Sequence, residues 1–570
     1  GEGFRRTGWA KGLAMRLLSV SSVVVVAGVT PMVALAQPDT AFPTEAQVTE
    51  ILRQVVESDR RTVGIVAGWS SAEGTHVVAF GSGGPGARPL NGDSVFEIGS
   101  ITKTFTATLL SEMARRGEVK LDDTVQQWLP ASVTMPQHGD VPIRLRDLAT
   151  HMSGMPRMPT NFNPSDPSNP YADYTAEDLY DFLNTLQLPR GVGEQTEYSN
   201  VAYGLLGHLL ERAGRQDYET LVRERIFSPL KMTSTTITLS DEFKSRLARG
   251  HDERLTPTSN WDLGALAGAG AIRSTVRDML AYGRACAGLD ETPLSDAIRA
   301  AQQYDITYGD AMYSLAWGRP SEVHGVRYIA HNGGTGGYRS MLVVDPVRKR
   351  TAIVLSNSTH SVDDIAMHLL IPKYPVQRWT VGPSVATETL DRYVGVYQIS
   401  PGAERTVTRY RDRLFVQRTG QPMRELLPRG ETEFFSREFG FSIVFEGANG
   451  PATRMVLTQS DGTLSPASRI DKPVTSRMVQ VDLATMDRVT GEYAFDDSPG
   501  GQLRVWREGE KMLGTLGTTT PVEIFPESST TYFYPLGDAT FTFALDADGP
   551  ASGVTLTQPG LPDQYAKRKP

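Results

Sequence analysis

The sequence predicts an α+β domain built on one mixed or antiparallel sheet, followed by two small all-β domains. Between residues 63 and 370, short β-type runs lie at both ends and helical patterns lie between them, whereas only short strands and turns are expected after residue 390. The sequence after residue 390 also contains one internal repeat. A sheet formed by both ends of the first region, with helices inserted between them, is the simplest arrangement of these elements.

The first domain is expected to span residues 37–370. It contains runs with the composition of strands, of which the first two have the pattern of a hairpin: 63–70, 75–81, 325–330, 338–344 and 350–356. Residues 371–389 contain three prolines and little periodicity, which is typical of a linker.

The segment after the linker contains an internal repeat. The sequence LDRYVGVY at 390–397 recurs as MDRVTGEY at 486–493, an offset of 96 residues. Each copy spans about 90 residues, which is too long for a solenoid repeat and suits a small closed β-barrel. We therefore expect one barrel at 390–480 and a second at 481–570. Both barrels are either purely structural or hold a ligand or partner.

The composition indicates a folded protein and argues against nucleic-acid binding. The 570 residues include 65 acidic and 57 basic side chains, which give a net charge of −8, and no run is rich in lysine and arginine. The electrostatic footprint of a nucleic-acid-binding protein is therefore missing. The single cysteine, Cys286, excludes an internal disulfide, so the stability of the chain must come from core packing.

The N-terminal 36 residues have the pattern of a signal peptide. The apolar stretch at 17–35 ends in the small-x-small triplet Ala34-Leu35-Ala36, and it follows four basic residues, Arg5, Arg6, Lys11 and Arg16. We expect cleavage after Ala36, a periplasmic or secreted bacterial protein, and no stable membrane anchor. An uncleaved anchor is the alternative, because residues 17–36 are just long enough to span a bilayer.

Ser100 and Lys103 form the first candidate catalytic pair. Apolar residues spaced four apart predict a helix that begins near Ser100 and ends at Gly117. One helical turn separates the two side chains, so the Lys103 amine can reach the Ser100 hydroxyl. A serine hydroxyl is a weak nucleophile until a neighbouring base or cation assists removal of its proton. A helix cap is the alternative interpretation of this serine.

Two further motifs carry candidate site residues. Tyr198 and Asn200 lie on a predicted loop at the start of a helix, where an asparagine ordinarily acts as an N-cap. The sequence His331-Asn332-Gly333-Gly334 ends one predicted strand and turns into the next. Its glycines predict close backbone approach to another group, such as a substrate, and a glycine-rich hairpin loop is the alternative.

The order Ser-x-x-Lys, Tyr-x-Asn, His-x-Gly resembles the serine β-lactamase/penicillin-binding-protein superfamily, in its class C, D-aminopeptidase and family VIII esterase branch. The flanking sequences FEIG before Ser100 and RDLATHMSGMP at 146–156 resemble that branch too. The resemblance covers residues 63–357. It implies a β-lactamase/transpeptidase-like α/β (α+β) catalytic domain with an antiparallel sheet flanked by helices. The two repeats resemble the paired lipocalin-like barrels of D-aminopeptidases.

The resemblance also implies roles for the catalytic residues. Ser100 would be the acylated nucleophile, and Lys103 would hold its hydroxyl. Tyr198 would act as general base and later as acid, provided that Lys103 lowers its pKa.

The remaining roles concern the substrate. Asn200 would orient it, and the backbone amides of Ser100 and Gly334, the latter next to Gly333, would form the oxyanion hole. No metal or cofactor is implied, and we interpret three further histidines as structural or surface residues: His208, His251 and His324.

His331 departs from the pattern, because class C β-lactamases and carboxypeptidases carry lysine there. An unperturbed histidine is mostly neutral at pH 7, so a substrate carboxylate would be held less well. This favours D-aminopeptidase, amidase or esterase activity on a small molecule or short peptide. A true β-lactamase or D,D-carboxypeptidase is the alternative, and a binding protein with an inactive hydrolase domain is the second alternative.

Overall fold

The computed structural model describes residues 41–569, except for 304, 438, 448–449, 496–501, 517–520, 536–538, 546–548 and 559–562. The predicted signal peptide lies outside these residues. Within the described ranges, no helix combines the length and apolar character needed to cross a membrane.

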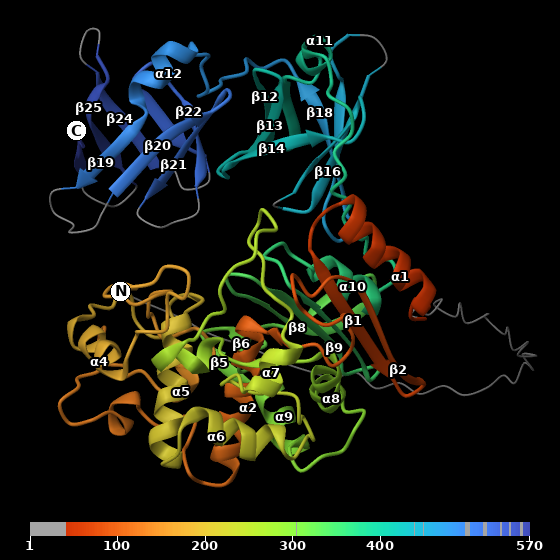
Figure 1. Cartoon of the computed structure of the whole chain (residues 1–570), viewed down its shortest axis with the longest axis vertical. Coiled ribbons are helices and arrows are strands. Elements are labelled where there is room, and N and C mark those ends of the chain that lie inside the picture. The colour runs from red at the N-terminus through yellow and green to blue at the C-terminus, as the bar shows by residue number, and fades with distance from the viewer. Residues whose placement is uncertain are drawn as a thin grey trace, which may run out of the picture. The chain divides into compact units, whose positions relative to one another are not determined.

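The first domain is built on an antiparallel sheet in the strand order β2-β1-β10-β9-β8-β7 (Figure 1). The strands are β1 (Gly64–Ser71), β2 (Gly74–Gly81), β7 (Ser321–Val323), β8 (Val326–Gly334), β9 (Arg339–Asp345) and β10 (Arg350–Ser356). The N-terminal hairpin therefore pairs through β1 with the C-terminal strand β10, with Val66 opposite Leu355. The sheet joins the two ends of the domain, as the sequence predicted.

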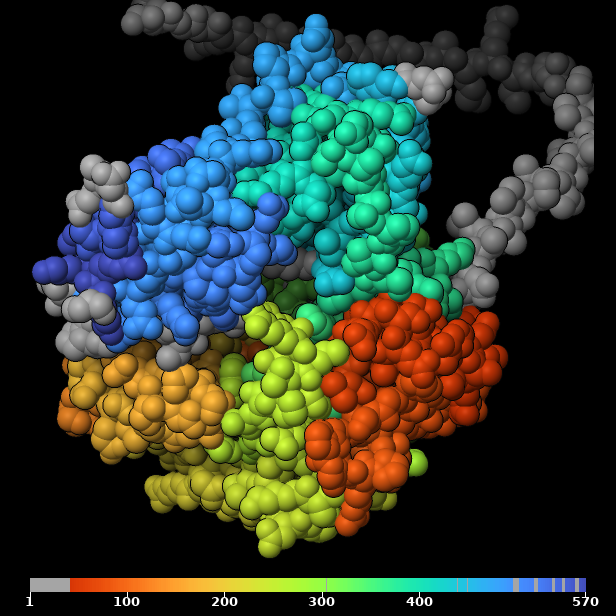
Figure 2. All heavy atoms as spheres, turned by 45° about the horizontal axis from the view of Figure 1, so that its top comes forward, coloured from red at the N-terminus to blue at the C-terminus, as the bar shows by residue number. Residues whose placement is uncertain are grey.

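Both faces of this sheet are buried, because successive side chains of a strand point to opposite sides. One face, which includes Val66, Leu342 and Ile353, packs with helices α2 and α8, whereas the other, which includes Ala67, Val343 and Val354, packs with α1 and α10. Helix α1 also lies along β2, and these segments form one red to orange surface in Figure 2. Because helices cover both faces of the sheet, the sequences of β1 and β10 are nearly continuous apolar runs.

The helices of this domain are α1 (Glu45–Arg53), α2 (Thr102–Arg115), α3 (Leu145–Ala149), α4 (Ala176–Thr185), α5 (Asn200–Gly214), α6 (Tyr218–Val222), α7 (Asp241–Arg246), α8 (Val276–Cys286), α9 (Ser295–Gln302) and α10 (Asp363–Leu370). Short 3₁₀ segments occupy Gly99–Ile101, Val125–Trp128 and Gly264–Ala269, and π segments occupy Gln54–Ser58 and Arg223–Phe227. Two small strand pairs complete the domain: β3 (Phe96–Glu97) with β4 (Arg273–Ser274), and β5 (Ile306–Tyr308) with β6 (Ala311–Tyr313).

The glycine-rich motif at 331–334 differs from the predicted turn. It lies inside β8, where His331 pairs with Leu342 and Gly334 pairs with Arg339. The glycines do allow a close backbone approach, but the approach is to the chain itself: a Cβ at Gly333 would overlap the Ile98 carbonyl oxygen. The strand continues to Gly334 because all four residues of the motif pair with β9.

Two closed antiparallel barrels follow, each with eight strands in the described part of the chain. The first contains β11 (Gly395–Ser400), β12 (Ala403–Tyr410), β13 (Arg413–Arg418), β14 (Met423–Pro428), β15 (Glu433–Ser436), β16 (Phe441–Glu446), β17 (Arg454–Thr458) and β18 (Leu464–Ile470). The second contains β19 (Gly491–Phe495), β20 (Gln502–Glu508), β21 (Lys511–Leu516), β22 (Val522–Pro526), β23 (Thr531–Tyr534), β24 (Ala539–Leu545), β25 (Ala551–Thr557) and β26 (Gln564–Arg568).

The repeated sequence builds the same corner in both barrels. Each copy begins with a short helix that the sequence analysis did not predict, α11 (Thr387–Asp391) or α12 (Leu483–Val489). In the first strand of each barrel a tyrosine hydroxyl donates a hydrogen bond to the backbone four residues earlier, over 2.8 Å for both Tyr397 and Tyr493. The repeat therefore encodes a helix-to-strand junction that closes the barrel wall.

Candidate active site

Ser100 lies in the 3₁₀ turn that precedes α2, one turn before Lys103. The Lys103 Nζ donates a hydrogen bond to the Ser100 Oγ over 3.0 Å and a second one to the Ala269 carbonyl over 2.6 Å. Gly99 adopts a left-handed conformation with φ of +51°, and a Cβ there would come within 2.6 Å of the Gly334 nitrogen. This close approach places the end of β8 beside the serine turn.

Lys103 is fully buried and, among the described residues, forms no ion pair with a carboxylate. Burial disfavours its charged form, and the positive charge of Arg157 acts in the same direction, so the pKa of the Lys103 amine is well below its ordinary value. A neutral amine within hydrogen-bond distance of a serine hydroxyl is able to accept the hydroxyl proton.

The Tyr198 ring packs against the same pair. Its centroid lies 4.9 Å from the Lys103 Nζ and 4.5 Å from the ring centroid of His151. Burial raises the pKa of Tyr198, although a hydrogen bond with Ser100 and the charge of Arg157 oppose this effect. The pKa of Tyr198 is thus raised and not lowered as expected, because the effect of burial outweighs the effects that oppose it. The phenol keeps its proton and is a hydrogen-bond donor in the resting site.

Asn200 is the first residue of α5, but it is not the helix cap. Ser199 has that role, since its Oγ accepts a hydrogen bond from the Ala202 amide over 2.9 Å. The Asn200 side chain is thus left for other contacts and lies 3.7 Å from the Met158 sulfur.

His331 is buried in β8, and its ring centroid lies 6.5 Å from that of Tyr198. Burial and the proximity of Lys103 lower the pKa of His331 to about 4. The residue is therefore neutral at pH 7, and more strongly so than an unperturbed histidine would be. The structure thus brings Ser100, Lys103, Tyr198 and His331 into one cluster.

Sequence reasoning did not assign two residues that shape this cluster. His151 has a left-handed backbone conformation with φ of 60°. Its Nδ1 accepts a hydrogen bond from the Ser199 amide over 3.1 Å. Its buried Nε2 has no hydrogen-bond partner among the described residues. Arg157 lies on the surface with its guanidinium 5.2 Å from the Tyr198 ring centroid. His151 falls within the RDLATHMSGMP stretch, which offered the only signal.

The comparison with known families decides the identity of the first domain. Residues 48–373, more than half of the chain, match the Beta-lactamase family. The chain belongs to the beta-lactamase family. It is a serine hydrolase of that family, with an α/β catalytic domain followed by two β-barrels. Residues 381–469, which include most of the first barrel, match a domain of unknown function, DUF3471.

Relatives in this family differ in their described activities. "Penicillin-binding protein 4*" of Bacillus subtilis (strain 168) is 27% identical over 67% of this chain and 89% of its own length. The D-alanyl-D-alanine-carboxypeptidase/endopeptidase AmpH of Escherichia coli (strain K12) is 29% identical over 46% of this chain and 71% of its own length. The crystal structure of a beta-lactamase/D-alanine carboxypeptidase from Pseudomonas syringae has a TM-score of 0.50 at 20% identity, over 58% of this chain and 99% of that chain, a likeness of fold alone.

Proposed function

We propose that this hydrolase cleaves amide or ester bonds through an acyl-enzyme on Ser100. The observation that carries the proposal is the 3.0 Å contact between the Ser100 hydroxyl and the Lys103 amine, because burial lowers the pKa of this amine and so favours the form that accepts a proton. Lys103 therefore takes the role of base, which the resemblance assigned to Tyr198.

The proposed reaction has two halves. Ser100 attacks the substrate carbonyl while Lys103 accepts the hydroxyl proton, and the amides of Ser100 and Gly334 stabilise the oxyanion. The proton then passes through Tyr198 to the leaving amine or alkoxide, which departs and leaves the acylated serine. Water, deprotonated by the same relay, releases the acid and restores Ser100.

The substrate class follows from the charge of the site. A buried, neutral His331 supplies no cation for a substrate carboxylate, so we propose D-aminopeptidase, amidase or esterase activity on substrates that place no carboxylate at this position. The two barrels after the catalytic domain support the D-aminopeptidase branch, where such barrels are lipocalin-like. The N-terminal sequence supports export to the periplasm or medium.

A D,D-carboxypeptidase is the second candidate, and a specific contact favours it. The Arg339 guanidinium fills the space where a side chain at Gly334 would begin, which places a cation at the end of β8. Release of D-alanine from an acetylated Lys-D-Ala-D-Ala peptide, compared with hydrolysis of D-alanine p-nitroanilide, separates the two candidates. A higher kcat/KM for the nitroanilide supports the aminopeptidase, and the reverse supports the carboxypeptidase.

The nucleophile is tested by covalent labelling. The wild-type protein is incubated with a fluorophosphonate, digested and analysed by mass spectrometry, beside Ser100→Ala and the exposed control Ser245→Ala. We expect the label on the Ser100 peptide in wild type and in Ser245→Ala, and none in Ser100→Ala. An unlabelled wild type, or a label on another residue, would contradict the proposal and favour a binding protein with an inactive hydrolase domain.

A further inference from the structure

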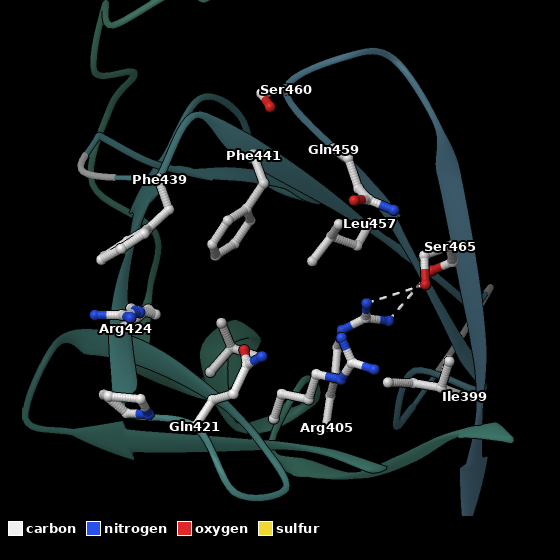
Figure 3. Close-up of a pocket in the computed structure, with 13 residues that line it drawn as sticks. Ile399, Arg405, Gln421, Arg424, Phe439, Phe441, Leu457, Gln459, Ser460 and Ser465 are labelled. Carbon is white, nitrogen blue, oxygen red and sulfur yellow. Dashed lines mark hydrogen bonds between the residues drawn. The ribbon is translucent and has the colours of Figure 1, made fainter. Parts of the chain in front are cut away.

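The first barrel contains a cavity of about 370 Å³ at one end of its interior. Small-molecule sites in proteins commonly measure about 300–1,000 Å³. The opposite part of the interior is filled by a core that includes Tyr393, Tyr397 and Phe445. The cavity end is lined by arginines and apolar side chains (Figure 3): Ile399, Arg405, Val416, Arg418, Gln421, Pro422, Arg424, Phe439, Phe441, Leu457, Gln459, Ser460 and Ser465.

Arg405 is the deepest charge of this cavity. It is only 6% exposed and donates hydrogen bonds to Ser465, to the hydroxyl over 3.0 Å and to the carbonyl oxygen over 3.4 Å. Its side chain lines the cavity, and Figure 3 shows the two hydrogen bonds between its guanidinium and Ser465. No carboxylate of the described residues pairs with it. Burial and the charge of Arg418 both lower its pKa.

Arg405 and Arg418 lie directly opposite each other on the neighbouring strands β12 and β13, and both line the cavity. Like charges at such a cross-strand position are destabilising. An anion bound between the two guanidinium groups would remove this repulsion, because arginine binds carboxylates through two parallel hydrogen bonds.

The second barrel shows that the fold does not require these charges. In the first barrel Arg405 lies opposite Tyr397, and Arg418 lies opposite Arg405. In the second barrel Leu503 lies opposite Tyr493, and Leu516 lies opposite Leu503. Leu503 and Leu516 therefore occupy the positions of Arg405 and Arg418. By the same register Val522 stands where the first barrel has Arg424. All three arginines of the cavity thus have apolar counterparts in the second barrel.

The apolar residues that line the cavity indicate which kind of group the ligand carries beside its acidic group. Phe441 and Leu457 point into the cavity in Figure 3, and Val416 completes an apolar wall. At the rim the Arg424 guanidinium lies over the Phe439 ring, 3.4 Å from its centroid. An apolar wall beside paired guanidinium groups suits a ligand with one acidic group and one apolar chain.

We propose that the open end of the first barrel is a binding site for an organic carboxylate with an apolar chain, with Arg405 and Arg418 holding the acid group. This site is independent of the proposed hydrolytic function. Because none of its lining residues belongs to the catalytic cluster, the two hypotheses fail separately.

The test uses isothermal titration calorimetry of the full chain with decanoate, its uncharged analogue decanol, and acetate. We expect saturable binding of decanoate and at least tenfold weaker binding of the other two compounds. The double variant Arg405→Leu/Arg418→Leu copies the second barrel, so it should fold and keep the esterase rate of wild type. Its affinity for decanoate should fall at least tenfold, while the control Arg454→Gln, in the same barrel outside the cavity, should bind normally.

Three results would overturn the proposal: no saturable decanoate binding by wild type, equal affinity of decanol and decanoate, or unchanged affinity in the double variant. Thermal melting decides whether the variant is folded. If it melts early, Arg405→Leu alone replaces it in the titration, with the same expected loss.

Discussion

At the scale of single residues, the charge state of the site differs from what the residue types suggest. Burial and the positive charge of Arg157 lower the pKa of Lys103. Burial raises the pKa of Tyr198, although the charge of Arg157 opposes this effect. Both shifts oppose the ordinary assignment of a charged lysine and an easily ionised tyrosine. We therefore expect the lysine to be the better base and the tyrosine to be the better donor.

Replacement of Tyr198 by phenylalanine tests the donor role. We expect kcat for a nitrophenyl ester to fall at least about a hundredfold with little change in KM, because the relay is removed and the shape of the site is kept. Stopped-flow and steady-state assays from pH 6 to 9 measure both constants. Equal rates of variant and wild type over this range would exclude Tyr198 from the mechanism.

Arg157→Gln tests the electrostatic control of Lys103. Removal of the cation stabilises the protonated amine, so the pKa of Lys103 rises and the acid limb of the kcat/KM profile moves to higher pH. A shift of a few tenths of a pH unit is expected for one exposed charge. Arg157→Lys, which keeps the charge, is the control and should restore the wild-type profile. An unmoved limb in the glutamine variant would show that Arg157 has no influence on the base.

His331→Lys tests the choice of substrate. We expect the ratio of kcat/KM for nitrocefin, which carries a carboxylate, to that for a neutral nitrophenyl ester to rise about tenfold, or about 1.4 kcal/mol. Because the pKa of His331 is about 4, lowering the pH from 7 to 6 should leave the wild-type ratio unchanged. A variant with the wild-type ratio would show that charge at this position does not select the substrate.

At the scale of secondary structure elements, the site depends on the contact between β8 and the segment that precedes α2. Gly333 lies against the Ile98 carbonyl and the Ser340 hydroxyl, which itself donates to Ile98 over 2.8 Å. The serine turn is therefore anchored to the sheet by backbone, and this leaves no space for a side chain at Gly333.

A matched pair of glycine variants tests this anchor. At Gly333 a Cβ would overlap backbone, whereas at Gly334 it would meet the end of the flexible Arg339 side chain. We expect Gly333→Ala to lose about 1–3 kcal/mol of unfolding free energy, as overpacked sites do, and Gly334→Ala to lose less. Chemical denaturation measures both, and equal losses would contradict the proposed role of this contact.

At the scale of the whole molecule, stability depends on groups that are buried in their neutral form. Burial lowers the pKa of His151 to about 3 and that of His331 to about 4, from ordinary values of 6.5. Between pH 6.5 and about 4 the unfolded chain binds protons that the folded chain does not. The free energy of unfolding therefore falls as the pH falls through this window.

The melting temperature, measured from pH 7.5 to 5, should thus decrease steadily below pH 6.5. Each histidine contributes a slope of at most about 1.4 kcal/mol per pH unit. His331→Gln removes one of the two groups, so its melting temperature should depend less on pH than that of wild type. A variant with the same or a steeper dependence would show that His331 does not contribute.

The sequence by itself determined the order of the domains, the sheet built from both chain ends, and the repeat behind the two barrels. These features rest on local patterns: apolar periodicity, turn residues and the repeated motif at 390 and 486. It also singled out Ser100, Lys103, Tyr198 and His331, which the structure brings into one cluster.

Only the tertiary structure decided the directions of the pKa shifts and the position of the cavity. The pKa of Lys103 depends on how deeply it is buried and on Arg157, a residue 54 positions away that no local pattern links to it. The motif at 331–334 continues β8 because it pairs with β9, and Arg405 faces Arg418 because of strand register. Burial and register arise from contacts between distant segments, so the sequence pattern alone does not contain them.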